Sequence, residues 1–183
     1  MRRSASVRLL IVVLIGAVAF ASGVMLGFKL DSSDEESTSE TSPVGVPVAV
    51  ERTRAALLAA AESGDYEALR PLIPANGAFK YTFGGPVEGG PIAYWRQLEQ
   101  NTSERPLEAL AAVLRMPYTL SRGYYYWPFA YDVADVADLS SHERELLAPL
   151  GPLDKVFVEG TGYLGWRAGI APDGTWVFFV AGD

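Results

Sequence analysis

The sequence contains no cysteine among its 183 residues. Disulfide bonds, thiolate metal ligands, thiol nucleophiles and a lipid-modified cysteine anchor are therefore all excluded. Histidine is nearly absent too, because His142 is the only one. A zinc site built from several histidines is thus excluded, and a Ser-His-Asp triad would have to use His142. This residue stands in "SSHEREL", a pattern typical of an exposed helix start.

The motifs of several large enzyme classes are also missing. The sequence has no G-x-S-x-G nucleophile elbow, no phosphate-binding glycine loop and no dinucleotide fingerprint. The glycines of "GGPVEGGP" alternate with proline, which indicates turns. We therefore expect no cofactor.

Basic residues are scarce outside the N-terminal segment. The first 30 residues carry four basic side chains and no acidic one, whereas the rest of the chain carries 11 basic and 22 acidic side chains, a net charge near −11. This balance argues against binding to nucleic acid, whose phosphates require an excess of lysine and arginine, and against docking on anionic lipid. Nucleic acid is therefore not an expected partner.

One long apolar run is present near the N-terminus. It begins at Leu9, ends at Phe28 and contains 20 residues without a charge, which as a helix span about 30 Å of hydrocarbon. Basic residues precede the run and acidic residues follow it, so we predict a single-pass transmembrane signal anchor over residues 9–28, with residues 1–8 in the cytoplasm. The alternative is a signal peptide cleaved after Ala21, which would release a secreted protein.

The segment after this run is polar and acidic. Residues 29–47 include "DSSDEESTSETSPVGVP" and no aromatic side chain. Such a composition buries too little apolar surface to offset the entropy lost on ordering, so we predict a disordered linker. Residues 48–183 are then an extracytoplasmic domain of a common size.

Local patterns in this domain predict helices first. Ala, Leu and Glu at helical spacing favour a hairpin of two helices, broken at Ser63 and Gly64, with Asp65 as the N-cap of the second. The stretch "GAFKYTF" alternates as a strand, and "EGGPIAYWRQLEQN" and "RPLEALAAVLRM" favour two more helices. A further short helix is expected in "LSSHERELLAPLG", with Ser140 or Ser141 as its cap.

The C-terminal stretch "YLGWRAGIAPDGTWVFFVAG" predicts a β-hairpin. Its turn is "PDG", which suits a three-residue loop with a bulge. With the bulge in the loop, one face of the hairpin is core and carries Trp166, Ala168, Ile170, Trp176, Phe178 and Val180. The other face then carries Arg167 beside Phe179, and its apolar character predicts either a covered surface or a pocket wall.

Aromatic side chains are concentrated in "RGYYYWPFAYD", which has six rings in eleven residues. The alternation predicts a strand that is aromatic on both faces and ends at Pro128. We expect most of these rings to be core, and one face to line a ligand pocket. The candidate ligand-binding residues are Arg167, Phe179, Tyr126, Trp127 and Asp132. In the alternative interpretation Arg167 only stacks on a ring or pairs with Asp132.

Acidic residues at a regular spacing form one more candidate site. In "DVADVAD", Asp132, Asp135 and Asp138 are three residues apart, so a helical turn would bring their carboxylates to one side. The spacing is not that of a calcium loop and the number of oxygen ligands is low. We therefore interpret the series as a solvated acidic edge or a set of helix caps, and predict no metal site.

The order of these elements predicts an α+β fold, with helices packed on a curved, mainly antiparallel sheet that ends in a C-terminal β-hairpin. In this order, "GDYEALRPLIPANGAFKYTFGG" and the closing hairpin resemble a nuclear-transport-factor-2-like domain. That resemblance implies a cone-shaped fold with an internal pocket. The strings "YWPFAYD" and "GWRAGIAPDGTWVFFVAGD" also resemble those of uncharacterised, membrane-anchored bacterial exported proteins, which implies a shared fold but no activity.

Three hypotheses for the function follow from the sequence. The first is a non-enzymatic, membrane-tethered exported domain that binds a small ligand or an envelope protein. The second is a hydrolase or isomerase that uses Asp132 or another carboxylate in a cone-shaped pocket, where burial would raise the pKa of that group. The third is a structural subunit of a membrane complex.

Overall fold

A computed structural model describes residues 45–182 of the chain. The predicted cytoplasmic segment 1–8, the predicted transmembrane segment 9–28 and most of the predicted linker 29–47 lie outside the described residues. Within residues 45–182, no helix combines the length and the apolar character that a membrane crossing requires. Residues 45–182 belong to one compact unit, and its architecture is α+β.

The N-terminal half of this unit is helical. It contains α1 (Val48–Glu62), the 3₁₀ helix η1 (Tyr66–Leu72), α2 (Gly90–Asn101) and α3 (Pro106–Arg115). The predicted pair of helices is confirmed, and Asp65 caps η1 by accepting a hydrogen bond from the Glu67 amide at 2.9 Å. The second member of the pair is a 3₁₀ helix, because Pro71 within it has no amide hydrogen to donate to an α-helical ladder.

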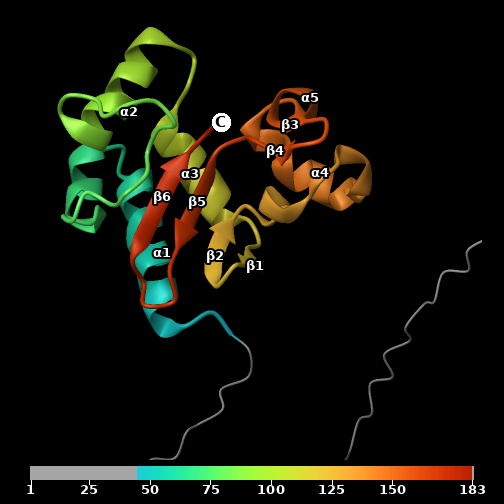
Figure 1. Ribbon diagram of the computed structural model, residues 1–183, viewed down its shortest axis with the longest axis horizontal. Coiled ribbons are helices and arrows are strands. Elements are labelled where there is room, and N and C mark those ends of the chain that lie inside the picture. Colours follow the sequence, from blue (N-terminus) through green and yellow to red (C-terminus); the bar gives the residue numbers. More distant parts are fainter. Residues whose placement is uncertain (1–44, 183) are drawn as a thin grey trace, which may run out of the picture. The chain divides into compact units, whose positions relative to one another are not determined.

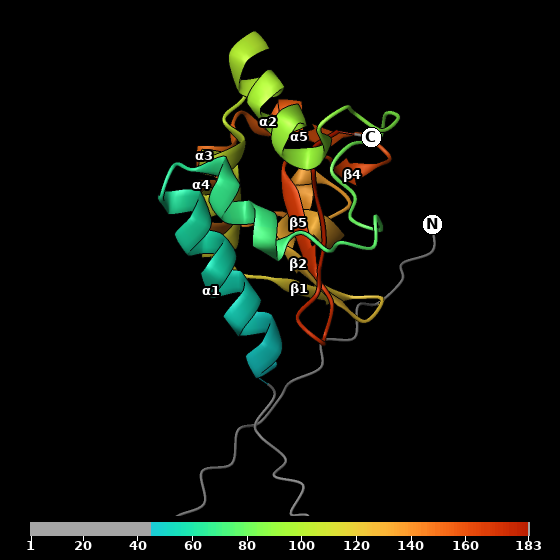
Figure 2. The same ribbon diagram turned by 90° about the vertical axis from the view of Figure 1, so that its left-hand side faces the viewer.

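A four-stranded antiparallel sheet follows, with the order β1-β2-β5-β6. Its strands are β1 (Thr119–Ser121), β2 (Tyr124–Trp127), β5 (Arg167–Ile170) and β6 (Trp176–Val180). Helices α1 and α3 lie on one side of the sheet (Figures 1 and 2). The strand β2 ends at Trp127, immediately before Pro128, as predicted.

The predicted strand "GAFKYTF" is largely wrong. Only Lys80 pairs with the sheet, through a parallel bridge to Phe178 in which the Lys80 amide donates to the Val177 carbonyl at 3.1 Å. A turn begins two residues later, where the Gly84 amide donates to the Thr82 hydroxyl at 3.0 Å. The chain therefore leaves the edge of β6 after a single residue of pairing.

Residues 129–165 form a second, smaller packing unit, which we call the small lobe. It contains the 3₁₀ helices η2 (Phe129–Asp132), η3 (Val136–Asp138) and η4 (Ala148–Leu150), the helices α4 (Ser141–Leu147) and α5 (Leu153–Val156), and the strands β3 (Phe157–Val158) and β4 (Gly162–Tyr163). The expected cap of α4 is confirmed, because Ser140 and Glu143 form a reciprocal capping box. Buried Leu139, Leu147 and Tyr163 form its apolar centre.

The main core fills the space between the helices and the sheet with aromatic rings. Trp95 of α2 lies 5.9 Å from Trp176 and 5.5 Å from Phe179 between ring centroids, and Trp166 stacks on Phe179 at 4.6 Å. These rings are all almost completely buried. Large rings supply much of the apolar burial that a domain without disulfides requires.

The register of the C-terminal hairpin differs from the predicted one. The three-residue loop is confirmed, since Ala171 and Thr175 are hydrogen-bonded across it. The bulge, however, lies within the ladder: Ile170 pairs with Trp176, but Gly169 pairs with Phe178 and Ala168 with Phe179. The extra residue on β6 reverses the alternation of the side chains that follow it. Phe179 is therefore core, and Phe178 and Val180 share the opposite face with Arg167.

Candidate ligand pocket

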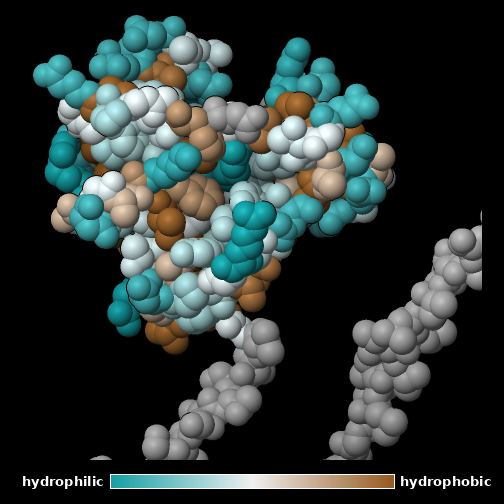
Figure 3. All heavy atoms as spheres, viewed as in Figure 1, coloured by the Kyte–Doolittle hydropathy of each residue, from teal (hydrophilic) through white to brown (hydrophobic). Residues whose placement is uncertain are grey.

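A cavity of about 500 Å³ lies against the sheet face that carries Arg167, between the sheet, the segment around Lys80 and the small lobe. We call it the sheet cavity. In the space-filling view the molecule is hollowed between the sheet and the small lobe, and hydrophilic and hydrophobic side chains meet there (Figure 3). The residues that line it are Lys80, Phe83, Ser121, Arg122, Tyr131, Asp132, Val133, Ala134, Thr161, Tyr163, Leu164, Arg167, Phe178 and Val180.

Arg167 is the one charged residue among the buried residues of the 45–182 range, with 7% of its surface exposed. It begins β5, and its guanidinium donates hydrogen bonds to the carbonyl oxygens of Gly165 at 3.1 Å and Gly182 at 2.7 Å. Burying a guanidinium is costly unless acceptors surround it. The two carbonyl groups thus hold this cation at the wall of the sheet cavity.

Two cations lie over the same aromatic ring at the rim of the cavity. The ammonium of Lys80 is 4.3 Å from the centroid of the Phe83 ring, and the guanidinium of Arg167 is 5.5 Å from it. Both distances are within the range in which a ring attracts a cation. Phe83 is 42% exposed, so this ring meets solvent while it helps to orient both cations.

A third cation comes from the turn between β1 and β2. Arg122 and Gly123 form a two-residue loop in which both have positive φ, 50° and 81°. This is the conformation of a type I′ turn, which favours Asn, Asp or Gly at its first position. Arg122 is the only residue other than glycine with a positive φ between positions 45 and 182. The chain therefore carries a strained arginine at the edge of the cavity.

The floor of the cavity is aromatic. The Phe178 ring lies over Gly169, and a Cβ atom at position 169 would overlap this ring. The centroid of the Phe178 ring is 5.5 Å from that of the Tyr126 ring. Tyr126 in turn stacks on Tyr131, with centroids 3.9 Å apart and planes at 5°. Burial is the main reason that the pKa of Tyr126 rises to about 12, because the charged phenolate is disfavoured away from water.

Asp132 is the one carboxylate among the lining residues that the structure describes. It is exposed, and Oδ2 accepts a hydrogen bond from the Thr119 hydroxyl at 3.0 Å. None of the ion pairs within residues 45–182 joins Asp132 to Arg167. The described residues of the lining thus include three basic side chains and one acidic side chain.

The candidate ligand-binding residues from the sequence are divided between the two faces of the sheet. Arg167 and Asp132 line the cavity, and Tyr126 lies on the same face beneath Phe178. Trp127 and Phe179 are on the opposite face, in the core.

Sequence reasoning missed most of the lining residues, among them Lys80, Phe83, Arg122 and Phe178. Of these, Arg122 had a visible signal, because it precedes a glycine between two short strand patterns where a type I′ turn is expected. Lys80 and Phe83 had none, since they are almost a hundred residues from β6 in sequence.

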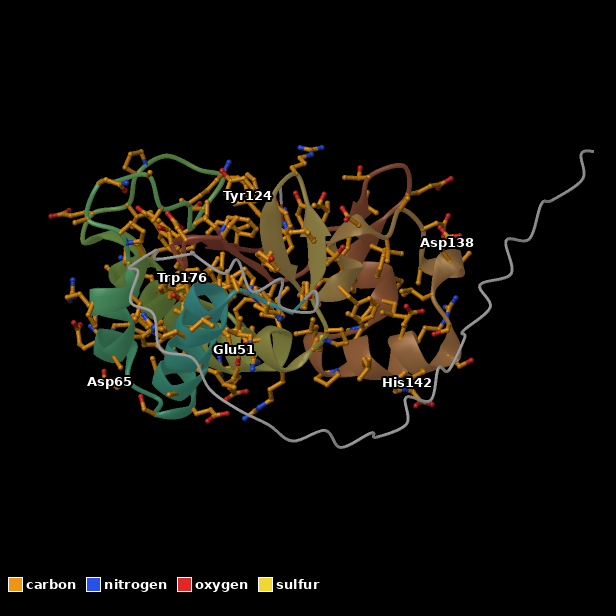
Figure 4. All side chains as sticks on the ribbon, turned by 90° about the horizontal axis from the view of Figure 1, so that it is seen from below. Glu51, Asp65, Tyr124, Asp138, His142 and Trp176 are labelled. Atoms are coloured by element: carbon orange, nitrogen blue, oxygen red, sulfur yellow. The ribbon has the colours of Figure 1, made fainter. Side chains whose placement is uncertain are left out.

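The remaining candidates for catalysis or metal binding lie elsewhere. His142 and Asp138 lie at the outside of the small lobe, whereas Trp176 lies inside the domain (Figure 4). Asp135 caps η3 by accepting a hydrogen bond from the Ala137 amide at 2.7 Å, as a helix-cap interpretation predicts. Among the described residues no group of three or more His, Cys, Asp or Glu side chains is placed to hold a metal ion.

Comparisons of the chain with family models, curated proteins and solved structures gave no match. The interpretation of the sheet cavity therefore depends on its own geometry and charge.

Proposed function

We propose that residues 48–183 are a non-enzymatic binding domain that takes a small ligand into the sheet cavity. The observation that carries this proposal is the cavity itself: about 500 Å³, walled by aromatic side chains and a buried arginine. Ligand sites in proteins are typically concave, mostly apolar and equipped with a few fixed polar groups. The volume, the rings and the held guanidinium of Arg167 agree with this description.

The composition of the lining favours binding over catalysis. Within residues 45–182 it includes the hydroxyls of Ser121 and Thr161 but no histidine, and its one carboxylate, Asp132, is exposed. A carboxylate that acts as a general base near neutral pH is usually buried, because burial raises its pKa toward the working pH. Asp132 lacks that environment.

The proposed setting is outside the cell membrane. Residues 9–28 act as a transmembrane anchor in this proposal, and residues 29–47 tether the domain to it. The support is the uncharged length of the apolar run and the excess of arginine before it. The nuclear-transport-factor-2-like resemblance stays a prediction from the sequence.

The test uses a variant that fills the sheet cavity. Ala134 lines the cavity and is exposed, so Ala134→Trp places a large ring there with little cost to the core. Ala137→Trp is the matched control, because Ala137 is also exposed but lies outside the lining. Phenyl-ring fragments with neutral, cationic and anionic substituents are titrated into the full-length protein, and binding is measured by NMR of the fragments.

We expect at least one fragment to bind the original protein and the Ala137→Trp variant, and to lose its binding in Ala134→Trp. If every fragment that binds does so equally in all three proteins, or if none binds, the sheet cavity is not a ligand site.

A further inference from the structure

We propose that the sheet cavity binds a neutral carbohydrate, whose sugar ring stacks on aromatic side chains while its hydroxyl groups bond to polar side chains at the rim. This inference rests on the proposed function, because it names the ligand class of the same cavity. Three observations carry it: the aromatic wall, a rigid stacked pair of rings within that wall, and the mixture of hydrogen-bond donors and acceptors around it.

The wall of the sheet cavity is more aromatic than those of its neighbours. Among the residues that the structure describes, four aromatic side chains line it, whereas the lining of a second cavity includes only Trp166 and that of a third includes none. The four are Phe83, Tyr131, Tyr163 and Phe178. A sugar ring has an apolar face of C–H groups, which packs against a flat aromatic ring and gains the free energy of apolar burial and close contact.

The ring of Tyr131 is held in place before any ligand binds. It stacks on Tyr126 of β2, with centroids 3.9 Å apart and planes at 5°, and Tyr126 is itself buried against the sheet. Because Tyr126 covers one face of Tyr131, the surface that Tyr131 gives to the cavity is its other face and its edge. A ring that is already fixed loses little conformational entropy when a ligand stacks on it.

The polar side chains of the lining include both donors and acceptors of hydrogen bonds. Lys80 and Arg122 only donate, and the carboxylate of Asp132 only accepts. The hydroxyls of Ser121 and Thr161 do both. Each hydroxyl of a sugar also donates and accepts, so its transfer from water into a cavity requires both kinds of partner.

Several of these polar groups are available to a ligand at the rim. Across residues 45–182, no hydrogen bond engages the ammonium of Lys80 or the hydroxyls of Ser121 and Thr161. Asp132 is exposed, and the hydrogen bond that it accepts uses Oδ2 and leaves Oδ1 for a ligand. The ammonium of Lys80 lies 4.3 Å from the centroid of the exposed Phe83 ring. A stacking surface and a hydrogen-bond donor are therefore adjacent.

The experiment titrates three disaccharides into the full-length protein: maltose, cellobiose and N,N′-diacetylchitobiose. Sorbitol is the control for stacking, because it is an open-chain polyol with hydroxyls but no ring. Binding is measured by NMR of the probes. We expect at least one disaccharide to bind about tenfold more tightly than sorbitol. Its binding should be insensitive to added salt, because salt screens interactions between charges and the ligand has none.

Variants of Tyr131 test the stacking. Tyr131→Leu removes the flat ring but keeps an apolar side chain, and it should weaken the binding of the preferred disaccharide about tenfold. Tyr131→Phe keeps the ring and should bind within about threefold of the original protein. Tyr118→Leu is the matched control, because Tyr118 is also a partly buried ring but lies outside the sheet cavity. Far-UV circular dichroism checks that each variant is folded.

Variants of Asp132 test the hydrogen bonds at the rim. Asp132→Ala removes the carboxylate acceptor and should weaken the binding of the preferred disaccharide about fivefold, as expected for the loss of one hydrogen bond. Asp138→Ala is the matched control, because Asp138 is also exposed but lies outside the lining.

Each outcome decides one of the two proposals. The carbohydrate inference is overturned if no disaccharide binds more tightly than sorbitol, or if Tyr131→Leu acts no more strongly than Tyr118→Leu. A phenyl fragment that still binds the original protein and not Ala134→Trp then leaves a ligand site of another class. Asp132→Ala acting no more strongly than Asp138→Ala overturns the role of the rim. Disaccharide binding that survives Ala134→Trp unchanged overturns the proposed function itself.

Discussion

At the scale of single residues, Arg122 combines an unfavourable backbone conformation with a place at the sheet cavity. A left-handed conformation costs a residue with a Cβ atom about 1 kcal/mol or more relative to glycine. Such strain is often retained where a side chain has a function. The exposed side chain of Arg122 covers little of the core, so packing does not account for the choice of arginine at this position.

We expect Arg122→Asn to stabilise the domain by about 0.5–1 kcal/mol, because asparagine adopts the left-handed region more readily. Urea unfolding of the full-length protein, followed by far-UV circular dichroism, measures this change. A loss of stability would show that the arginine side chain supports the fold.

At the scale of elements, the β5–β6 hairpin forms the wall between the core and the cavity. Its core face carries Ala168, Ile170, Trp176 and Phe179, and its other face carries Arg167, Gly169, Phe178 and Val180. The bulge in β6, opposite the Gly169–Ile170 step, determines which face of the hairpin each residue of β6 occupies. The glycine within β5 leaves room for the Phe178 ring to lie flat on the strand.

Gly169→Ala should therefore destabilise the domain by about 1–3 kcal/mol, because the new methyl group overlaps the Phe178 ring and forces it toward the cavity. A double-mutant cycle with Phe178→Ala isolates this contact. In the Phe178→Ala background, Gly169→Ala should cost clearly less in urea unfolding. Equal costs in both backgrounds would mean that the ring does not limit the size of residue 169.

At the scale of the whole molecule, the proposed organisation is an N-terminal anchor, an acidic linker and one binding domain. The described part, residues 45–182, accounts only for the domain. The anchor is supported by the run from Leu9 to Phe28, the arginine residues before it and the acidic residues after it. A tethered binding domain of this kind would keep its cavity close to the outer surface of the membrane.

We expect protease added to sealed, right-side-out membrane vesicles to remove the epitope-tagged C-terminal domain and to leave a short membrane-embedded fragment. The reason is the excess of arginine before residue 9, which keeps the N-terminus in the cytoplasm. Vesicles opened with detergent are the control. Full protection of the domain in sealed vesicles would contradict the proposed topology, and a mature protein that begins at Ser22 would replace the anchor with a cleaved signal peptide.

Several local features were predictable from the sequence, since each depends on a few neighbouring residues. Asp65 and Ser140 are helix caps as predicted, because a short polar side chain can reach amides only two or three residues ahead. The loop at residues 172–174 is also as predicted, because Gly174 supplies its left-handed position. The α+β class follows from the order of such local patterns.

The tertiary structure alone decided which residues meet at the sheet cavity. Alternation assigned Phe179 to that face, but one bulged residue within β6 reversed the assignment and put Phe178 there instead. Lys80 and Phe83 join Arg167 across more than eighty residues of sequence. Neither effect leaves a local mark, because a bulge depends on how two strands pack together and a cavity depends on segments that approach only when the chain is folded.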